Sequence, residues 1–371
     1  MLFRSRRLAI NGKFLIAGPT GVHRVAEQLL RQLERHGGEF AGLFEKSPTV
    51  IAPPNLHRRS LDIFEVERGG TFRGQLWEQL DLPRLTRPDL LLNLCNLGPM
   101  ASTAAITMIH DAQVFATPES YSWAFAKWYR NVLPVLGSRH AQILTVSEFS
   151  ANELARFGVA RREHISVVPN GVDHLFAYDS QPEIVSRLAL VSRKFVVALA
   201  NVQAHKNIGL LLKAFTASEV AELKLVLVGP SRRAEFEALG HSVPPNVVFA
   251  GRISDGELRA LLESALCVGF PSTTEGFGLP PLEGMILGCP AILAPCGALT
   301  EVAGEGALFA APDDPRQWIS AIRRLVDEPG HWAEYSRAGR ERAAFFTWKR
   351  AGEKLANIIR EVAIGLLSKR H

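Results

Sequence analysis

Short apolar runs alternate with amphipathic stretches through the first half of the chain. The apolar runs, each bounded by Pro, Gly, Asn or Ser, are residues 90–96, 104–111, 141–147 and 165–171. Apolar residues recur at helical spacing in residues 21–37, 120–140 and 150–158. In the last of these, Ser150 and Glu153 have the spacing of a capping box, which predicts a helix start at Ser150. Continuous apolar strands that alternate with helices are typical of a parallel sheet covered on both faces.

The same alternation starts again in the second half. Its apolar runs are residues 195–201, 223–229, 246–251, 265–271 and 290–295, and its helical stretches include residues 207–215 and 255–265. Residues 172–192, between the two halves, are irregular and polar and are interpreted as a linker. The chain ends in a long amphipathic stretch, residues 349–370, with basic residues in its last turn.

These patterns predict an α/β protein with two Rossmann-like, doubly wound parallel-sheet domains. We expect the first domain at residues 1–175, the second at 176–348, and a C-terminal helix at 349–371 that crosses back to the first domain. Open parallel sheets bind ligands at the carboxyl ends of their strands. We therefore expect the two domains to face each other across a cleft that holds both sets of strand ends.

The composition agrees with two globular domains and narrows the choice of partners. The chain has 371 residues, of which 47% are hydrophobic and 21% charged, and a domain typically has about 100–200 residues. The net charge of +5 is spread along the chain without a long basic run or an RNA-binding signature, which argues against a nucleic-acid-binding protein. A weak basic excess fits an enzyme that handles phosphates or touches an anionic membrane face.

Cysteine usage and the distribution of apolar residues predict a cytoplasmic protein. No two cysteines form a CxxC pair, so we expect reduced thiols and no zinc site. The first apolar run is interrupted at residues 11–13, which argues against a secretory signal. The uncharged residues 90–109 contain asparagines and a Gly-Pro pair, whose polar groups a bilayer would leave unsatisfied, so we expect no membrane span there.

The segment STTEGFGLPPLEGMILGCP, residues 272–290, is the strongest candidate for chemistry. It follows an apolar run and precedes a helix that Pro280 and Pro281 are suited to open. A strand, a glycine-rich loop and a helix start present free backbone N–H groups and the positive end of a helix dipole, and both attract phosphate. Gly276 and Gly278 let the backbone approach an anion closely.

Three charged side chains in or near this segment are candidates for ligand binding, and two of them also have a structural interpretation. Glu283 lies about one turn inside the helix, where it either accepts two adjacent hydroxyls, as on a ribose, or only complements the helix dipole. Glu275 lies in the loop, where a carboxylate repels a phosphate unless it binds something else. Lys206 precedes Asn207, a candidate N-cap, so its ammonium and the helix amides would converge on one anion unless the lysine is merely solvated.

These stretches resemble the retaining glycosyltransferases of family 4, which have the two-domain GT-B fold. PSTTEGFGLPPLEGMILGCPAI, residues 271–292, resembles their E-x7-E segment, and residues 247–265 resemble the stretch that leads to it. VPNGVD, residues 168–173, is similar to the segment leading into the second domain, and ANVQAHKN, residues 200–207, to the phosphate-binding strand and loop. Residues 10–30, INGKFLIAGPTGVHRVAEQLL, resemble the first strand, loop and helix of bacterial polysaccharide glycosyltransferases. The five stretches occur in the family's order.

The resemblance implies a role for each candidate residue of the second domain. Glu283 would hold the ribose of a nucleotide sugar, Glu275 would lie beside the hydroxyls of the transferred sugar, and Lys206 would neutralise the diphosphate leaving group. The backbone N–H groups that would line the sugar diphosphate belong to Gly276, Phe277, Gly278 and Leu279.

The resemblance has one departure, which concerns a second cation at the phosphate site. The family commonly has an arginine five residues before the lysine or directly before it, and this chain has Asn201 and His205 there. We expect both residues to contact the donor, with His205 or Arg232 as the replacement for the missing cation.

In the first domain, the resemblance points to the ends of two strands. His110 ends a buried strand and would hydrogen-bond the transferred sugar, whereas without the resemblance it is equally a satisfied core histidine. Gly21 lies at the first strand–helix turn and would let the backbone approach a phosphate or sugar, or simply form a tight turn. Arg24 would bind donor or acceptor, or pair with a neighbour. The aromatic residues within 123–129 form a packing face or contact a lipid-linked acceptor.

The activity implied by the resemblance is the transfer of a hexose to a saccharide or polyprenyl-linked acceptor in exopolysaccharide, O-antigen or lipopolysaccharide assembly. The first domain would bind the acceptor and the second the nucleotide diphosphate sugar. We expect mannose from GDP-mannose, with a UDP-hexose as the alternative donor. A nucleotide-sugar 2-epimerase and a non-catalytic nucleotide-sugar-binding scaffold are the alternatives in function.

Mechanism and location follow from the same residues. The chain contains no Asp-x-Asp, so we expect neither a metal ion nor another cofactor. No second carboxylate is available as a nucleophile once Glu283 is assigned to the ribose, so front-face attack assisted by the leaving phosphate is the preferred mechanism. We expect weak peripheral attachment to the cytoplasmic face of the inner membrane through the basic excess.

Overall fold

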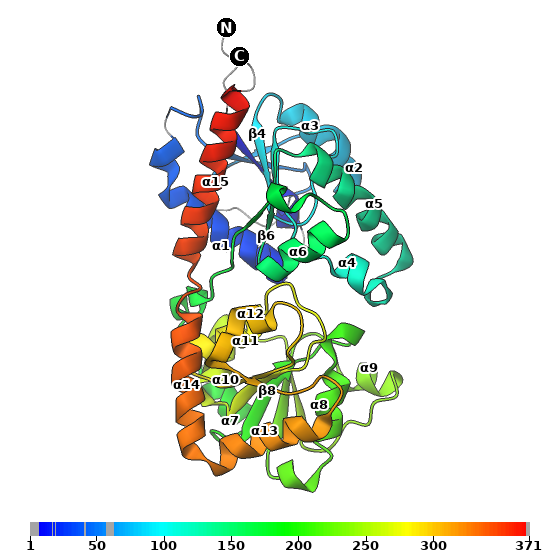
Figure 1. The fold of residues 1–371 in the computed structure, drawn as a ribbon, viewed down its shortest axis with the longest axis vertical. Helices are drawn as coiled ribbons and strands as arrows, with labels where there is room; N and C mark the ends of the chain where they lie inside the picture. The colour runs from blue at the N-terminus through cyan, green and yellow to red at the C-terminus, as the bar shows by residue number, and fades with distance from the viewer. Residues whose placement is uncertain (1–6, 17, 19, 41, 57–62, 369–371) are drawn as a thin grey trace. The chain divides into compact units, whose positions relative to one another are not determined.

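The computed structural model describes residues 7–368 apart from 17, 19, 41 and 57–62, and these residues form two compact units. Unit 1 consists of the described residues up to Gly171 and from Trp348 onward, and unit 2 runs from Val172 to Thr347. Figure 1 shows the last helix, α15 (Trp348–Ser368), lying along unit 1. Residues 369–371, the end of the predicted C-terminal helix, lie outside the described residues.

A close contact joins α15 to α1 (Gly21–Arg35) within unit 1. At Gly352 in α15, an added Cβ would lie 2.2 Å from Gln32 Cβ in α1. Real Cβ atoms do not approach this closely, so the two helices pack against each other only because this position is glycine. The chain therefore returns to unit 1 after completing unit 2.

Unit 1 is built on a seven-stranded sheet with the order β3-β2-β1-β4-β5-β6-β7, and all its strand pairs are parallel. The strands are β1 (Leu8–Asn11), β2 (Thr49–Ala52), β3 (Glu65–Arg68), β4 (Leu90–Asn93), β5 (Ala105–Met108), β6 (Gln142–Thr145) and β7 (Ile165–Val167). The other helices are α2 (Gly74–Leu76), α3 (Leu82–Leu85), α4 (Gln113–Ala116), α5 (Trp123–Arg139) and α6 (Glu148–Arg156). Every residue of β4 and β5 is buried, which explains their continuous apolar sequences.

The predicted capping box at Ser150 is wrong. Helix α6 begins at Glu148, and its N-cap is Ser147, whose hydroxyl accepts a hydrogen bond from Ser150 N. Ser150 lies inside the first turn, and its own hydroxyl donates to the carbonyl of His110 at 3.2 Å. The sequence offers two serines with capping chemistry three positions apart, and the position of the preceding strand selects the first of them.

Unit 2 is built on a six-stranded sheet with the order β10-β9-β8-β11-β12-β13, again with parallel pairs only. The strands are β8 (Phe195–Leu199), β9 (Lys224–Val228), β10 (Val247–Gly251), β11 (Cys267–Phe270), β12 (Ala291–Leu293) and β13 (Leu308–Phe309). The helices are α7 (Glu183–Arg187), α8 (Ile208–Ala214), α9 (Arg233–Ala238), α10 (Asp255–Ser264), α11 (Leu279–Ile286), α12 (Leu299–Ala303), α13 (Pro315–Asp327) and α14 (Pro329–Ala343). The prediction of two parallel-sheet α/β domains is confirmed.

The linker predicted at residues 172–192 is instead part of unit 2. It contains the 3-10 helix η6 (Asp173–Ala177) and helix α7. Leu175 and Ile184 are buried in a core cluster of unit 2 together with residues of β8 and α10. Single apolar residues that are widely spaced along a polar segment show neither helical nor strand periodicity. Such a segment is therefore predicted as a loop from sequence alone.

Each sheet reverses its winding direction at one position. In unit 1 the switch lies between β1 and β4, and in unit 2 between β8 and β11. The loops that leave adjacent strands diverge at such a point and open a crevice at the carboxyl ends, where doubly wound proteins bind ligands. The switch points therefore locate the candidate sites.

Buried polar side chains form a chain of hydrogen bonds across unit 1. Asn11 Nδ2 in β1 donates to Asn93 Oδ1 in β4, and Asn93 Nδ2 donates to Thr107 Oγ1 in β5, both at 2.9 Å. Thr107 Oγ1 lies 2.7 Å from Nδ1 of His140, which precedes β6. His140 Nε2 donates to the carbonyl of Pro99 at 3.1 Å. Buried polar groups are stable only when they are hydrogen-bonded, so this network favours one alignment of the neighbouring strands.

Acid is expected to destabilise unit 1 through two buried histidines. Burial lowers the pKa of His110 and of His140 from 6.5 to about 4. Between pH 6.5 and pH 4 the unfolded chain thus binds more protons than the native state, so the free energy of unfolding falls as the pH falls through this window. The loss is about 3 kcal/mol for each histidine by pH 4.

Urea unfolding of the wild type and of His140→Gln at several pH values between 7 and 4 measures this effect. The variant lacks one titrating group, so its stability should fall less steeply with acid than that of the wild type. Equal slopes for the two proteins would contradict the assignment of His140 as a buried neutral imidazole.

No helix among the described residues is long and apolar enough to cross a membrane. The cysteine thiols Cys95, Cys267, Cys289 and Cys296 are not joined in disulfides.

Candidate active site

Lys206 and Glu275 form an ion pair at the switch point of unit 2. Lys206 ends the 3-10 helix η7 (Ala204–Lys206) in the loop after β8, and Glu275 lies in the loop after β11. Lys206 Nζ lies 2.6 Å from Glu275 Oε1, and the exposed fractions of the two side chains are 16% and 10%. Because the residues are 69 positions apart in the sequence, only the pairing of β8 with β11 brings them into contact.

This contact satisfies two charges that water reaches poorly. Removing either partner from such a pair leaves the other charge uncompensated in a medium that solvates it weakly. An anion that entered the site would compete with Glu275 for the Lys206 ammonium. The pair carries no net charge, and a diphosphate could bind Lys206 only by breaking its contact with Glu275.

Asn207 is not a side-chain N-cap, contrary to its predicted capping role. It adopts the left-handed conformation with φ of 54° between η7 and α8, and its side chain makes no capping bond. Its Nδ2 instead donates to the carbonyls of Pro271 and Pro312, at 3.2 Å and 2.7 Å. Asparagine tolerates this φ better than most residues, and the amide ties the loop after β8 to the end of β11.

The glycine-rich loop after Glu275 leads directly into α11. Gly278 has a φ of 95° and is the N-cap of that helix, and prolines occupy its first positions as predicted. An added Cβ on Gly278 would lie 2.6 Å from Leu299 Cδ2, so the loop packs tightly against α12. Phe277 is buried and meets Phe346 edge-on, with 5.5 Å between the ring centroids. Backbone placement in this loop is therefore fixed by packing on both sides.

Gly297 supports Glu275 and was not recognised from the sequence. It has a φ of 61°, and an added Cβ would lie 2.6 Å from the backbone N of Glu275. The next residue, Ala298, donates its N–H to the carbonyl of Glu275 at 3.0 Å. The Pro-Cys-Gly sequence after β12 indicates a turn, but nothing in it indicates which loop the turn supports.

Glu283 is buried beside a histidine of the η6 helix. Its Oε1 lies 3.1 Å from His174 Nε2, and the exposed fractions of the two side chains are 9% and 1%. A carboxylate that only complemented the helix dipole would be expected at the helix surface, in contact with water. The burial of Glu283 beside His174 favours a specific role. His174 was not singled out in the sequence, since it lies in the supposed linker.

An apolar cavity of about 80 Å³ borders Glu283. Its wall includes Leu199, Val228 and Phe270 from the carboxyl ends of β8, β9 and β11, and Glu283 is the only charged residue among the described residues that line it. The cavity is well below the volume of roughly 300–1,000 Å³ that small-molecule sites usually have. It therefore serves as a low-dielectric wall for the carboxylate and is too small to hold a nucleotide.

The residues expected to replace the missing second cation lie in different surroundings. His205 is buried, and its carbonyl accepts a hydrogen bond from Thr273 N at 2.8 Å. Asn201 donates through Nδ2 to the side chain of Gln203 at 3.1 Å. Arg232 is exposed at the N-cap position of α9. These contacts assign no second cation to the Lys206 site.

The candidates of the first half all lie in unit 1. His110 is buried, and its Nε2–H donates to the carbonyl of Leu94 at 2.9 Å. With its lowered pKa the ring is neutral at pH 7, and Nδ1 keeps a lone pair with no hydrogen-bond partner among the described residues. Gly21 begins α1, and an added Cβ there would meet no atom within 4 Å. Arg24 lies one turn further along the same helix.

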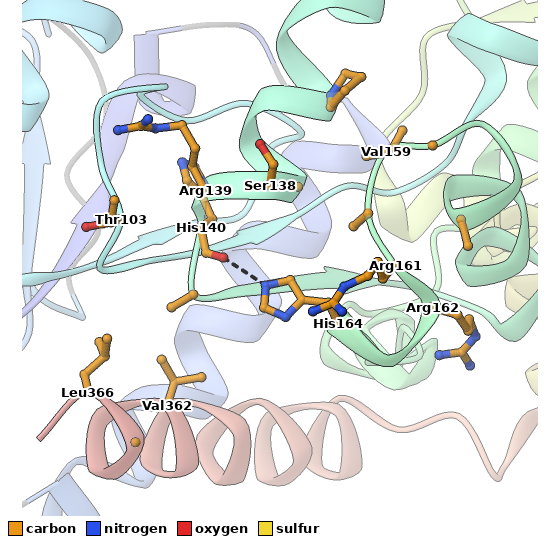
Figure 2. A pocket seen from close by; sticks show the side chains of 17 residues that line it. Thr103, Ser138, Arg139, His140, Val159, Arg161, Arg162, His164, Val362 and Leu366 are labelled. Carbon is orange, nitrogen blue, oxygen red and sulfur yellow. Dashed lines mark hydrogen bonds between the residues drawn. The ribbon is translucent and has the colours of Figure 1, made fainter. Parts of the chain in front are cut away.

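A cavity of about 1050 Å³ in unit 1 lies away from the switch point of that unit. Figure 2 shows it bordered by Arg161, Arg162 and His164, which precede β7, and by Val362 and Leu366 of α15. Arg161, Arg162 and His164 lie at the amino end of β7. The two arginines already contact the carboxylates of Glu163 and Glu148. Open parallel sheets bind ligands at the opposite edge, so size alone does not make this groove the active site.

No group of three or more His, Cys, Asp and Glu side chains in the described part of the chain is arranged to hold a metal ion.

Doubly wound sheets with a glycine-rich loop and a helix start at the switch point are typical of α/β proteins that bind nucleotides. The sequence matches known families over most of its length. Residues 19–174 match Glycosyltransferase Family 4, and residues 180–342 match the glycosyl transferases group 1. The chain therefore belongs to the glycosyltransferases, with the Family 4 match in its first half and the group 1 match in its second half.

Several relatives are mannosyltransferases. The O-antigen chain mannosyltransferase RfbU of Salmonella typhimurium is 27% identical over 235 residues, which cover 62% of this chain and 63% of that protein. The MMP alpha-(1->4)-mannosyltransferase of Mycolicibacterium hassiacum is 30% identical over 282 residues, which cover 70% of this chain and 64% of that protein. The chain thus spans somewhat less than two thirds of the length of these relatives.

Solved structures share the fold. Sucrose-phosphate synthase from Thermosynechococcus elongatus superposes with a TM-score of 0.74 at 18% identity, covering 98% of this chain and 100% of that one. HepE of Anabaena, in complex with UDP and glucose, gives a TM-score of 0.71 at 16% identity, covering 96% of this chain and 100% of that one. At these identities the likeness concerns the fold alone, and it confirms the predicted GT-B class.

Proposed function

We propose that this protein transfers a hexose, with retention of configuration, from a nucleotide diphosphate sugar to a saccharide or lipid-linked oligosaccharide acceptor. Polysaccharide or O-antigen assembly is the setting supported by relatives such as RfbU, an O-antigen chain mannosyltransferase. GDP-mannose is the proposed donor. A relative from Mycobacterium tuberculosis, 32% identical over 163 residues, is named as a GDP-mannose-dependent mannosyltransferase.

The Lys206–Glu275 pair is the observation that carries this proposal. When the sugar–phosphate bond breaks, negative charge develops on the leaving diphosphate, and a preorganised cation at that position lowers the barrier. Lys206 would exchange Glu275 for the diphosphate, while N–H groups of residues 276–279 and the start of α11 bind its other oxygens. Glu275, released from the lysine, would accept hydroxyls of the sugar.

The remaining residues complete the assignment. Glu283 would hold the ribose hydroxyls through the carboxylate oxygen that does not contact His174. His110 would accept a sugar hydroxyl hydrogen at Nδ1, because its Nε2–H is committed to Leu94. No second carboxylate is assigned to the anomeric carbon, so the acceptor hydroxyl would attack from the face that the diphosphate leaves, and a diphosphate oxygen would take its proton.

Binding and product analysis with a donor panel test the proposal. The purified protein is heated with GDP-mannose, UDP-glucose and dTDP-glucose, since a ligand that binds the native state raises the unfolding midpoint. GDP-mannose should give the largest shift, and with an acceptor extract it should release GDP. Release of an epimerised nucleotide sugar instead would identify a 2-epimerase. Binding without turnover towards any saccharide acceptor would identify a scaffold.

Chelation by EDTA is expected to leave turnover unchanged. The proposed leaving-group stabilisation relies on a lysine ammonium and backbone amides, none of which needs a metal ion. Initial rates are compared before and after EDTA treatment, with added Mg²⁺ or Mn²⁺ as the control. Activity that disappears with EDTA and returns with either ion would contradict the role of Lys206.

We further infer weak attachment to anionic membranes through unit 1. Helix α5 exposes Trp123 by 74%, and Lys127 Nζ lies 4.5 Å from the centroid of its ring. Aromatic rings beside cations favour the headgroup region, and each basic residue near an anionic surface adds about 1 kcal/mol. The fraction of the protein that sediments with anionic vesicles should therefore decrease at high salt, and it should also decrease in the Trp123→Ser variant. Neutral vesicles serve as the control. Binding that resists high salt would contradict an electrostatic attachment.

A further inference from the structure

A second lysine–glutamate pair lies at the switch point of unit 1. Lys13 follows β1, and its Nζ lies 2.7 Å from Oε2 of Glu78. The exposed fraction of the Glu78 side chain is 3%. A glutamate is almost never buried to this extent unless it is paired. Each sheet of the protein thus has a shielded lysine–glutamate pair at the carboxyl ends of its central strands.

Glu78 is held by both of its oxygens on an unusual piece of backbone. Its other oxygen, Oε1, accepts a hydrogen bond from Asn11 Nδ2 at 2.9 Å, and Asn11 is in turn fixed by Asn93. Glu78 lies in a single π-helical turn (Trp77–Asp81), and such turns occur frequently at functional sites. A carboxylate has about four lone-pair directions, so two donors leave it able to accept more hydrogen bonds.

The pair borders a cavity of about 250 Å³. Its lining is mixed: Phe14, Leu97 and Tyr129 supply apolar surface, and polar or charged groups come from Asn11, Lys13, His23, Gln75 and Glu78. The volume is slightly below the range of roughly 300–1,000 Å³ that holds drug-sized ligands, so it suits one ring rather than an extended chain. A site with this many polar groups beside apolar surface suits a ligand that has both hydroxyls and an apolar face, as a sugar ring has.

Tyr129 contributes an uncommitted donor to this cavity. Its ring stacks on Phe125 with 4.2 Å between centroids, and its hydroxyl has no hydrogen-bond partner among the described residues. Burial, and secondly the charge of Glu78, raise the pKa of this hydroxyl, so it keeps its proton at neutral pH. The cavity therefore offers a hydroxyl donor, a carboxylate acceptor and an aromatic face.

We propose that this cavity of unit 1 binds one uncharged sugar ring of the acceptor, with ring hydroxyls on Glu78 and Tyr129. Because Lys13 and Glu78 pair with each other, the lysine is not available as a free cation for a phosphate, so the site favours a neutral polyol. The apolar C–H face of the ring would pack on the aromatic and aliphatic walls. This inference rests on the proposed function, because it specifies the chemistry of the acceptor end.

Saturation-transfer NMR on the full chain without donor tests the proposal. The probes are methyl glycosides of mannose, glucose and galactose at millimolar concentration, with inorganic phosphate as a competitor. Tyr129→Phe keeps the stacked ring and removes only the hydroxyl, and Glu78→Gln keeps the shape and removes the charge. Tyr121→Phe is the matched control, since Tyr121 is in the same aromatic stack but its hydroxyl donates to Gln113 outside the cavity.

At least one glycoside should bind, and phosphate should not displace it. Loss of one hydrogen bond should weaken binding by about fivefold in Tyr129→Phe, and Glu78→Gln should weaken it further, while Tyr121→Phe binds as the wild type. Displacement by phosphate, equal binding by all four proteins, or no binding of any glycoside would overturn the proposal. The thermal shift with GDP-mannose is measured on the same samples. If that shift is absent in the wild type, the proposed donor fails independently of the sugar cavity.

Discussion

Glu275→Gln is expected to lower kcat by about 10²–10³-fold, the range seen when one preorganised group at a developing charge is removed. The donor KM should change much less. Glu275 contacts Lys206 in the free enzyme and would bind the sugar when the lysine turns to the leaving diphosphate, so its effect belongs to the transition state rather than to donor binding. Steady-state kinetics with varied donor separates the two parameters.

A double-mutant cycle with Lys206→Met shows whether the two residues act together. Because their side chains are in direct contact, the effects of the single changes should not add, and the double variant should be little worse than either single one. Additive effects would mean that the pair has no shared role in turnover.

Glu263→Gln is the matched control for this experiment. Glu263 also forms an ion pair, with Arg259 on the surface of α10 at 2.8 Å, but it lies outside the site. Exposed pairs of this kind contribute about 0.2–1 kcal/mol, so the control should keep wild-type kinetics. Unfolding midpoints establish that each variant is folded at the assay temperature. Wild-type kcat in Glu275→Gln would remove the central support of the proposed function.

Glu283→Gln is expected to raise the donor KM by about 10–100-fold, as expected when a hydrogen bond to a charged group is lost. We expect kcat to stay close to that of the wild type. The ribose does not react, so its contacts are equal in the ground state and the transition state, and losing them weakens binding uniformly. The unfolding midpoint in the presence of GDP should fall in parallel with affinity.

His174 provides a second test of the same assignment. His174→Gln keeps a polar side chain beside Glu283, whereas His174→Leu leaves a buried carboxylate with an apolar neighbour. The leucine variant should raise the donor KM, and the glutamine variant should restore most of the affinity. Glu301→Gln, in α12, is an independent control. A Glu283→Gln variant with unchanged KM and reduced stability would identify Glu283 as a residue of the fold alone.

Strand and helix order could be predicted from the sequence because both sheets are parallel and buried. A strand such as β4 is covered on both faces, so its residues form the continuous run Leu90–Asn93 that stands out from its polar flanks. β3 (Glu65–Arg68) was not predicted, because it is an edge strand with mostly exposed residues and no apolar run. The supposed linker was misread for a related reason, since its few buried residues are too widely spaced to form a pattern.

The glycine-rich loop, its two glutamates and Lys206 were identified as separate candidates from local features. A loop between a strand and a helix, with glycines and prolines at characteristic positions, is a property of neighbouring residues and is therefore visible in the sequence. The capping roles of Ser150 and Asn207 were wrong, since several polar residues near a helix start compete for the same backbone groups. Which one wins depends on where the preceding strand ends.

The two parallel sheets, the order of most elements and the loop with Glu275 and Glu283 could be inferred from local patterns in the sequence. These depend on hydrophobic periodicity and turn chemistry, which act over a few residues. The partners of the charged side chains depend on the folded chain: Glu275 meets Lys206, Glu283 meets His174, and Lys13 meets Glu78. The members of each pair are separated by dozens of residues, and a side chain's charge does not specify which distant carboxylate or cation it meets. Strand order places their loops side by side, and burial then makes each pairing necessary, since a charge removed from water needs a partner.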